Sequence, residues 1–151
     1  LAVTIALEPD ITPEDVVLDR DDLVWAHSPG VDFVAAPRLP LITWGPRCFF
    51  GTLASRLLTD AGTNYKVSYE LPTIAAVQTA LINGAGIALL NRMVIEETDL
   101  ATTGTPELPV APRVAYVLRR HPETIGNPLH DLVADQIQTS FRPHYNGALH
   151  R

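Results

Sequence analysis

Hydrophobic and polar positions alternate in the middle of the chain, between Tyr65 and Glu70. Val67 and Tyr69 are separated by polar residues, and this period of two is typical of a strand with one face in the core. We therefore expect Val67 and Tyr69 to be buried. A second apolar run, Ile87–Leu90, has no polar interruption. Such a run favours a short strand that is covered on both faces.

The segment between these two strands has the spacing of a helix. Apolar residues recur every three or four positions, at Ile74, Val77 and Leu81. Pro72 favours an extended backbone at Leu71, and Thr73 can then cap the helix by accepting a first-turn N–H. Gly84 and Gly86 can adopt positive φ and end the helix. Strand, helix and strand together predict a parallel βαβ unit.

The remaining elements follow from the same patterns. Further strands are expected at Leu1–Leu7, Leu41–Trp44 and residues 114–120, and further helices at Cys48–Asp60 and Asn127–Phe141. The expected core faces of these two helices are Leu53, Leu57 and Leu58 in the first, and Leu129, Leu132, Val133 and Ile137 in the second. Residues 92–99 predict a short helical turn and residues 100–112 an irregular loop. We expect an α/β fold in which the strands Leu41–Trp44, Lys66–Tyr69 and Ile87–Leu90 share one mainly parallel sheet flanked by helices.

Several stretches of the chain resemble segments of a known protein family. Residues 75–90 read AAVQTALINGAGIALL, residues 39–50 read LPLITWGPRCFF, and residues 18–30 read LDRDDLVWAHSPG. They resemble the words AAVQAAVRAGLGIALLP, LPLILFPPGCLFR and LRREPLVWVAAPGHPL of the effector-binding domain of LysR-type transcriptional regulators. The first strand and residues 114–120 resemble the family's DLALV and ELALYRR. The resemblance covers about residues 1–141 in the family's order. It departs at Asn91, where the family usually has proline, and at Arg47 and Gly51, where it has glycine and arginine.

This resemblance implies the periplasmic-binding-protein-like fold of type two, in which two α/β subdomains are joined by hinge strands and an effector binds in the cleft. One subdomain is then complete and the other partial. Residues 1–38 are the remnant of the first subdomain with its first hinge strand, and 39–112 the second subdomain. Residues 113–120 are the returning hinge strand, 121–142 a C-terminal helix on the first subdomain, and 143–151 a tail. The first strand is a parallel-sheet element in the family.

The resemblance also implies that segments of the family's full-length proteins are absent here. A winged helix-turn-helix, a linker helix and the opening half of the first subdomain would precede Leu1. We interpret the chain as a fragment that reaches DNA only through that absent helix-turn-helix domain. Because the strand Leu1–Leu7 and the helix Asn127–Phe141 would lose their cover, we expect self-association into a homo-oligomer.

Composition and charge narrow the class of protein further. The chain has 151 residues, with 11 basic and 17 acidic side chains and a net charge of −6. A DNA-binding surface would normally be basic, so this segment is not expected to be one. A single cysteine excludes an internal disulfide framework and fits a cytoplasmic location. No apolar run reaches the roughly 18 residues that span a bilayer, so we expect no membrane association.

The sequence contains no recognisable catalytic or metal-binding constellation. The five histidines are scattered over loops, a helix and the tail without ligand spacing. There is no nucleophile elbow or phosphate loop, and Gly84-Ala-Gly86 follows a helix instead of opening one. Cys48 stands near a helix N-terminus, where a redox role is conceivable but a packed thiol is the simpler interpretation. We expect no enzyme activity, no catalytic residues, no metal and no cofactor.

Candidate ligand contacts lie where two helices begin after strands. In open α/β sheets, ligands bind at the carboxyl ends of strands, where helix N-termini offer unpaired N–H groups. With Arg47 nearby, this arrangement favours a small organic anion. The predicted ligand-binding residues are Gly45, Pro46, Arg47, Cys48, Leu71, Thr73 and Ile74. Thr73 as a simple cap and Arg47 as a solvated turn residue remain the alternatives.

Three hypotheses for function remain open. The first is the effector-sensing domain of a LysR-type DNA-binding regulator, which binds a small-molecule effector. The second is a solute-binding protein of a transporter, which shares the fold and would need a signal peptide. The third is an enzyme or an unrelated α/β domain. The sequence upstream of Leu1 would distinguish them.

Overall fold

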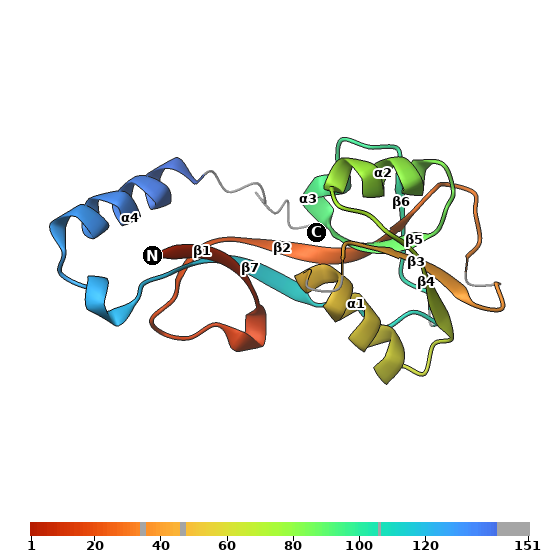
Figure 1. The fold of residues 1–151 in the computed structure, drawn as a ribbon, viewed down its shortest axis with the longest axis horizontal. Helices are drawn as coiled ribbons and strands as arrows, with labels where there is room; N and C mark the ends of the chain where they lie inside the picture. Colours follow the sequence, from red (N-terminus) through yellow and green to blue (C-terminus); the bar gives the residue numbers. More distant parts are fainter. Residues whose placement is uncertain (34–35, 46–47, 106, 142–151) are drawn as a thin grey trace, which may run out of the picture. The chain divides into compact units, whose positions relative to one another are not determined.

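A computed structural model describes residues 1–33, 36–45, 48–105 and 107–141. The chain divides into two compact units. Unit 1 contains Leu1–Asp22 and the segment from Pro112 onward, and unit 2 contains Leu23–Ala111. The strand β2 (Val16–His27) contributes its first part to unit 1 and its second part to unit 2. Figure 1 shows the elements in their order along the chain.

Unit 2 is built on three parallel strands. They are β3 (Leu39–Thr43), β4 (Tyr65–Glu70) and β5 (Ile87–Asn91), and β3 pairs in parallel with both of the others. The second part of β2 runs antiparallel to β5 and to β6 (Ala101–Thr103). The expected α/β fold, with its three strands in one sheet, is confirmed, and the sheet around them is mixed.

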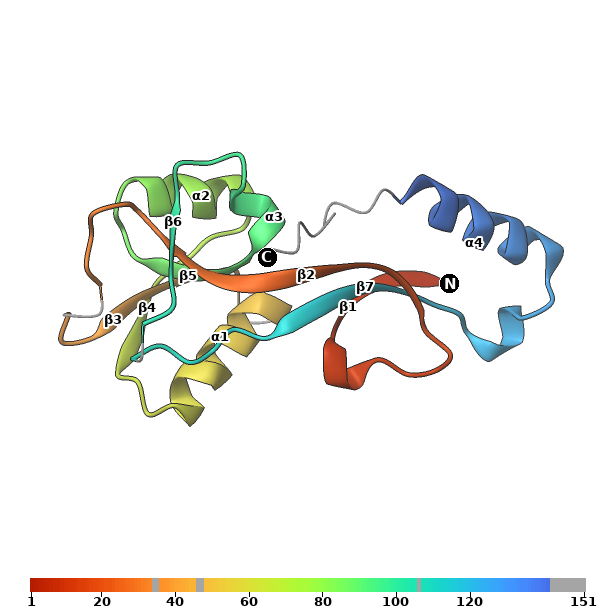
Figure 2. The ribbon, with the colours of Figure 1, turned by 180° about the vertical axis from the view of Figure 1, so that it is seen from behind.

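Helices cover both faces of the sheet in unit 2. Figures 1 and 2 show α2 (Ile74–Ile82) and the short α3 (Arg92–Ile95) on one side and α1 (Phe49–Asp60) on the other. Val77, Leu81 and Ile95 of the first pair pack against Ile42, Ala88 and Leu90 of the strands. On α1 the buried residues are Gly51, Leu53, Ala54 and Leu58. The apolar run of β5 is buried throughout, as the sequence predicts.

Three expectations for unit 2 are wrong in detail. Val67 and Tyr69 are 43% and 51% exposed, because β4 is the last strand of the sheet and its register with β3 shifts between these two residues. Ile74 is 39% exposed because it occupies the first position of α2, at the margin of the helix's packed face. Residues 100–112 are not wholly irregular, since they contain β6.

Two glycines, Gly84 and Gly86, lie in the connection between α2 and β5, and each is required for a different structural reason. Gly84 takes φ +71°, the left-handed conformation that ends a helix. Gly86 does not, contrary to expectation. A Cβ at Gly86 would lie 2.3 Å from the carbonyl oxygen of Pro40, so this position needs glycine because β3 passes close by.

Unit 1 consists of antiparallel strands and one helix. The strand β7 (Arg113–Arg119) pairs antiparallel with β1 (Ala2–Leu7) and with the first part of β2. The expectation of a parallel partner for the first strand is therefore not met among the described residues, where its partner is the returning strand β7. Two 3₁₀ turns, Glu8–Asp10 and Pro122–Thr124, flank these strands.

The helix α4 (Pro128–Ser140) begins as the sequence predicts. The Asn127 side-chain oxygen accepts the Leu129 N–H at 3.0 Å, and Pro128 stands at the first helical position. Its apolar stripe is not a core face, however, since Leu129, Leu132 and Val133 are exposed and Ala134 is the buried residue. An exposed stripe of this kind is the feature from which we expected self-association, and that expectation stays a prediction.

Candidate functional site

The carboxyl ends of the three parallel strands carry most of the predicted ligand contacts. These strands end at Thr43, Glu70 and Asn91. The Leu71 N–H donates to the Thr43 carbonyl oxygen at 2.8 Å, which joins the segment after β4 to the end of β3. Two of the predicted residues, Gly45 and Cys48, belong to the connection between β3 and α1. Three others, Leu71, Thr73 and Ile74, belong to the connection between β4 and α2 and to the first residue of that helix.

Two predicted residues, Pro46 and Arg47, lie outside the described part of the chain. Their role in binding remains a prediction from the sequence.

The start of α2 has the predicted cap. The Thr73 hydroxyl accepts the Ala76 N–H at 3.2 Å, and the Thr73 carbonyl accepts the Val77 N–H at 3.1 Å. The cap satisfies one of the first-turn donors, while others in a first turn have no partner inside the helix. Ile74, which begins the helix, is partly exposed beside them. This terminus combines partial positive charge with an accessible apolar side chain.

The start of α1 has no side-chain cap. The half-buried Cys48 occupies the N-cap position, and its side chain makes no capping hydrogen bond. Its N–H donates to the Gly45 carbonyl oxygen at 2.9 Å, and its carbonyl accepts the Thr52 N–H at 3.0 Å. The first-turn N–H groups of α1 consequently receive no capping hydrogen bond from the Cys48 side chain, and a helix N-terminus without such a cap can bind an anion.

The helix α1 lies very close to the end of β3. A Cβ at Gly51 would be 2.1 Å from the Thr43 Oγ1 and 3.1 Å from the Trp44 carbonyl oxygen. The Thr43 hydroxyl is itself fixed, because it donates to that carbonyl at 3.1 Å. Gly51 is thus the residue that allows the helix N-terminus to reach the strand end, and no sequence pattern predicted this close approach.

Aromatic side chains flank the turn into α1. Trp44 and Phe50 have ring centroids 5.6 Å apart, and Phe49 meets Phe50 edge to face at 5.3 Å. Trp44 also packs with Leu71 against the core under α2. Aromatic residues before and after the turn were visible in the sequence, but nothing in their spacing indicated that they would form a cluster.

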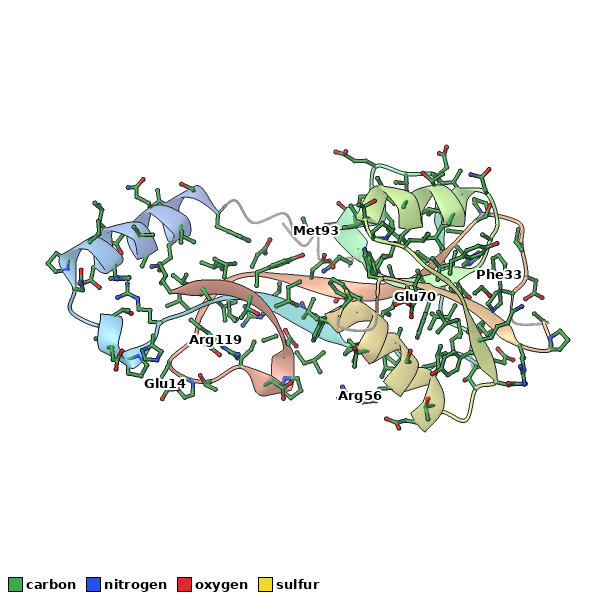
Figure 3. All side chains as sticks on the ribbon, in the orientation of Figure 1. Glu14, Phe33, Arg56, Glu70, Met93 and Arg119 are labelled. Atoms are coloured by element: carbon green, nitrogen blue, oxygen red, sulfur yellow. The ribbon has the colours of Figure 1, made fainter. Side chains whose placement is uncertain are left out.

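A groove of about 290 Å³ adjoins this edge. Gly45 lines it, together with Thr43, Thr52 and the exposed Glu70, which Figure 3 labels. Asn91, at the end of the neighbouring strand, is only 4% exposed, and its side-chain N–H₂ group has no hydrogen-bond partner in the described part of the chain. Polar residues at strand ends are the signal that could have identified Thr43, Glu70 and Asn91 from the sequence.

Two further structural observations bear on the class of protein. Among the described residues, no three His, Cys, Asp or Glu side chains gather as they would around a metal ion. The same residues contain no helix with the length and apolar character that a transmembrane span requires.

An α/β sheet with two helix N-termini at the carboxyl ends of its strands defines a ligand-binding domain of the open-sheet type. The family model of the LysR substrate binding domain matches residues 3–141. The chain therefore belongs to this family, and it is an effector-binding domain of the LysR-type regulators.

Two curated relatives agree with this assignment, and a solved structure shares the fold. The chain is 28% identical over 145 residues to the HTH-type transcriptional regulator PecT of Dickeya dadantii, covering 95% of the chain and 45% of PecT. It is 27% identical over 111 residues to the HTH-type transcriptional regulator DgdR of Burkholderia cepacia, covering 74% of the chain and 38% of DgdR. The full-length structure of HypT from Salmonella typhimurium, a hypochlorite-specific LysR-type regulator, superposes with a TM-score of 0.67 at 16% identity, covering 91% of the chain and 51% of HypT. The chain thus spans less than half the length of these two curated relatives.

Proposed function

We propose that this chain is the effector-sensing part of a LysR-type DNA-binding transcriptional regulator and that its effector is a small organic anion. The observation that carries the proposal is the pairing of two helix N-termini at the carboxyl edge of one parallel sheet, within a chain of this family. DNA contact belongs to a helix-turn-helix domain of the parent protein. The names of the curated relatives support a regulator in preference to a transporter component. The parent would act in the cytoplasm, where a transcription factor meets DNA, and as a homo-oligomer.

The anionic character of the ligand rests on the donors at this edge. The first turns of α1 and α2 present N–H groups and the positive ends of their helix dipoles. The buried amide of Asn91 adds a donor that a ligand oxygen could satisfy. Glu70 would repel an anion placed directly in the groove beside it, so we assign the anionic group to the helix N-termini and not to the groove. The proposed contacts are the segment from Gly45 to Cys48, which includes Arg47, and the segment from Leu71 to Ile74.

The exposed apolar residues at the same edge suggest the rest of the ligand. Phe49 and Ile74 are the first residues of α1 and α2, and both are partly exposed. A carboxylate with an apolar body would place its charge on the N–H groups and its body against these side chains. We therefore expect aromatic or branched carboxylic acids to bind better than inorganic anions.

Calorimetry with a carboxylate effector selected by thermal-shift screening tests the proposal. Loss of a charge-assisted hydrogen bond costs about 1.5–3 kcal/mol, so Arg47→Ala should weaken binding roughly tenfold to a hundredfold. Thr73→Ala should weaken it less. Arg56→Ala is the matched control, because Arg56 is an exposed arginine of α1, about two turns beyond the start of that helix. Equal affinities for wild type, Arg47→Ala and Thr73→Ala would remove this site from consideration.

A further inference from the structure

The groove of about 290 Å³ at the carboxyl edge of unit 2 contains the carboxylate of Glu70, the charged side chain among its described lining residues. Glu70 ends β4 and is in register with Thr43 at the end of β3. Its side chain is exposed, and its carboxylate forms no hydrogen bond or ion pair with the described part of the chain. The charge of Glu70 is therefore free to attract a ligand.

Hydroxyl groups surround this carboxylate. The helix α1 contributes Thr52 and Ser55 to the lining, and β3 contributes Thr43. A hydroxyl oxygen has lone pairs that accept hydrogen bonds, as a carboxylate does. No lysine, arginine or histidine stands among the described lining residues. The described part of the groove is thus suited to a group that donates several hydrogen bonds and carries positive charge, which an ammonium group does.

The N-terminus of α1 borders the same groove. Gly51, the third residue of α1, lines the groove together with Gly45 from the preceding turn. The N–H groups of a helix's first turn have no acceptor inside the helix, and the positive end of the helix dipole lies beside them. A small ligand in this groove therefore meets an end that favours an anion and a side chain that favours a cation.

A buried amide faces the same side of the sheet as α1. Successive side chains of a strand point to opposite faces. Ala88 and Leu90 of β5 pack in the core cluster with the residues of α2, so Asn91 faces the α1 side. Asn91 is 4% exposed, and its N–H₂ group has no partner among the described residues. A buried donor without an acceptor indicates a missing ligand oxygen, and this indication is independent of the helix terminus.

We propose that the effector is an amino acid with an aromatic or branched side chain, bound as a zwitterion. The inference rests on the anion site proposed above and adds a second charge to its ligand. The carboxylate binds at the N-terminus of α1, and the ammonium group donates to Glu70 and to the hydroxyls of the groove. The side chain of the amino acid packs on the partly exposed Phe49 and Ile74.

An NMR titration of the whole 151-residue chain with three related probes tests the proposal. L-Phenylalanine carries both charges, 3-phenylpropionate lacks the ammonium group, and phenethylamine lacks the carboxylate. Because Glu70 is exposed and its charge is screened, L-phenylalanine should bind about fivefold more tightly than 3-phenylpropionate. It should also bind more tightly than phenethylamine. Both carboxylates should shift the signals of Gly51 and of the Asn91 side-chain amide. Leucine and 4-methylpentanoate repeat the comparison for a branched side chain.

The variant Glu70→Gln removes the negative charge and keeps the shape of the side chain. It should lower the affinity for the amino acids about fivefold, to that of their des-amino analogues. The affinity for 3-phenylpropionate should stay unchanged or rise slightly, because a repulsive charge has been removed. Asp60→Asn is the control, since it removes an exposed carboxylate at the other end of α1 and changes the net charge by the same amount. It should leave the preference for the amino acids intact.

The outcomes distinguish a failure of this inference from a failure of the proposed function. If the des-amino carboxylates shift the signal of Gly51 but both amino acids bind no more tightly, the anion site stands and the zwitterion is wrong. Equal effects of Glu70→Gln and Asp60→Asn, or binding of phenethylamine as tight as that of L-phenylalanine, would also overturn the zwitterion. If none of the carboxylates shifts that signal, both the anion site and this inference are wrong.

Discussion

Replacing Gly86 with alanine should destabilise unit 2, because the neighbouring strand β3 leaves no room for the added methyl group. The same change at a glycine with free space around its Cβ position should not. The added Cβ would lie 2.3 Å from the Pro40 carbonyl oxygen and 3.0 Å from the Ile42 Cγ1. The side chain of Ile42 could adjust by rotation, but the carbonyl belongs to β3, which is paired on both sides by β4 and β5. Relief of the contact therefore requires the central strand of the parallel sheet to move.

The magnitude follows from two opposing effects. A Gly→Ala change at a compatible position stabilises by about 0.4–1 kcal/mol, because alanine lowers the entropy of the unfolded chain. Forcing an extra carbon into a packed region costs about 1–3 kcal/mol and more where the backbone must shift. Since the contact is with backbone, we expect the second effect to prevail and Gly86→Ala to lower the free energy of unfolding by about 2 kcal/mol.

Urea unfolding monitored by tryptophan fluorescence measures this change. Trp25 is 2% exposed and belongs to unit 2, so its emission reports on the relevant part of the chain. The control is Gly104→Ala, because a Cβ at Gly104 would meet nothing within 4 Å. Gly104→Ala should leave stability unchanged or raise it slightly. A midpoint for Gly86→Ala equal to that of Gly104→Ala would refute the close approach of β3 on which the reasoning depends.

Three further outcomes are expected. Thr73→Ala should cost about 1 kcal/mol of stability, measured by urea unfolding, because the hydroxyl caps α2, whereas Thr73→Ser should restore most of it. Gly51→Ala should cost about 1–3 kcal/mol through its clash with Thr43 and should also weaken carboxylate binding at the N-terminus of α1. The hydrogen bond from Arg119 lowers the pKa of Asp15 from 3.8 to about 2. Because this pKa is lowered in the folded state, the Asp15 carboxylate contributes its full stabilisation above about pH 3.8, and the contribution is lost as the pH falls toward 2. The difference in stability between wild type and Asp15→Asn should therefore disappear across that pH range. Acid titration followed by circular dichroism measures it.

The element-level fold could be predicted because it depends on local signals. The apolar run Ile87–Leu90, the cap at Thr73 and the Asn127-Pro128 helix start are each readable within a few residues. The predictions failed where burial depends on a neighbouring element that is distant in the sequence. The alternation around Val67 fits a strand, yet it does not say whether a neighbour covers that face, and β4 is the last strand of the sheet. The three residues of β6 are too few to carry a period at all.

The candidate site shows the same division between local and non-local information. The segments that begin α1 and α2 were found from caps, turns and the order of elements. Gly51 and Asn91 were not found from the sequence. The role of Gly51 depends on the distance between α1 and β3, and the role of Asn91 depends on the burial of the end of β5. A glycine that permits a close helix approach looks, in sequence, like any other glycine within a helix. Only the packed structure distinguishes them.

The direction of the parallel strands explains why an anion suits the carboxyl edge of this sheet. All three parallel strands end on the side where α1 and α2 begin, so the positive ends of the helix dipoles gather there. Because β5 ends at this edge with Asn91, a change in the packing of this strand would alter the site, and Gly86→Ala should also impair anion binding there.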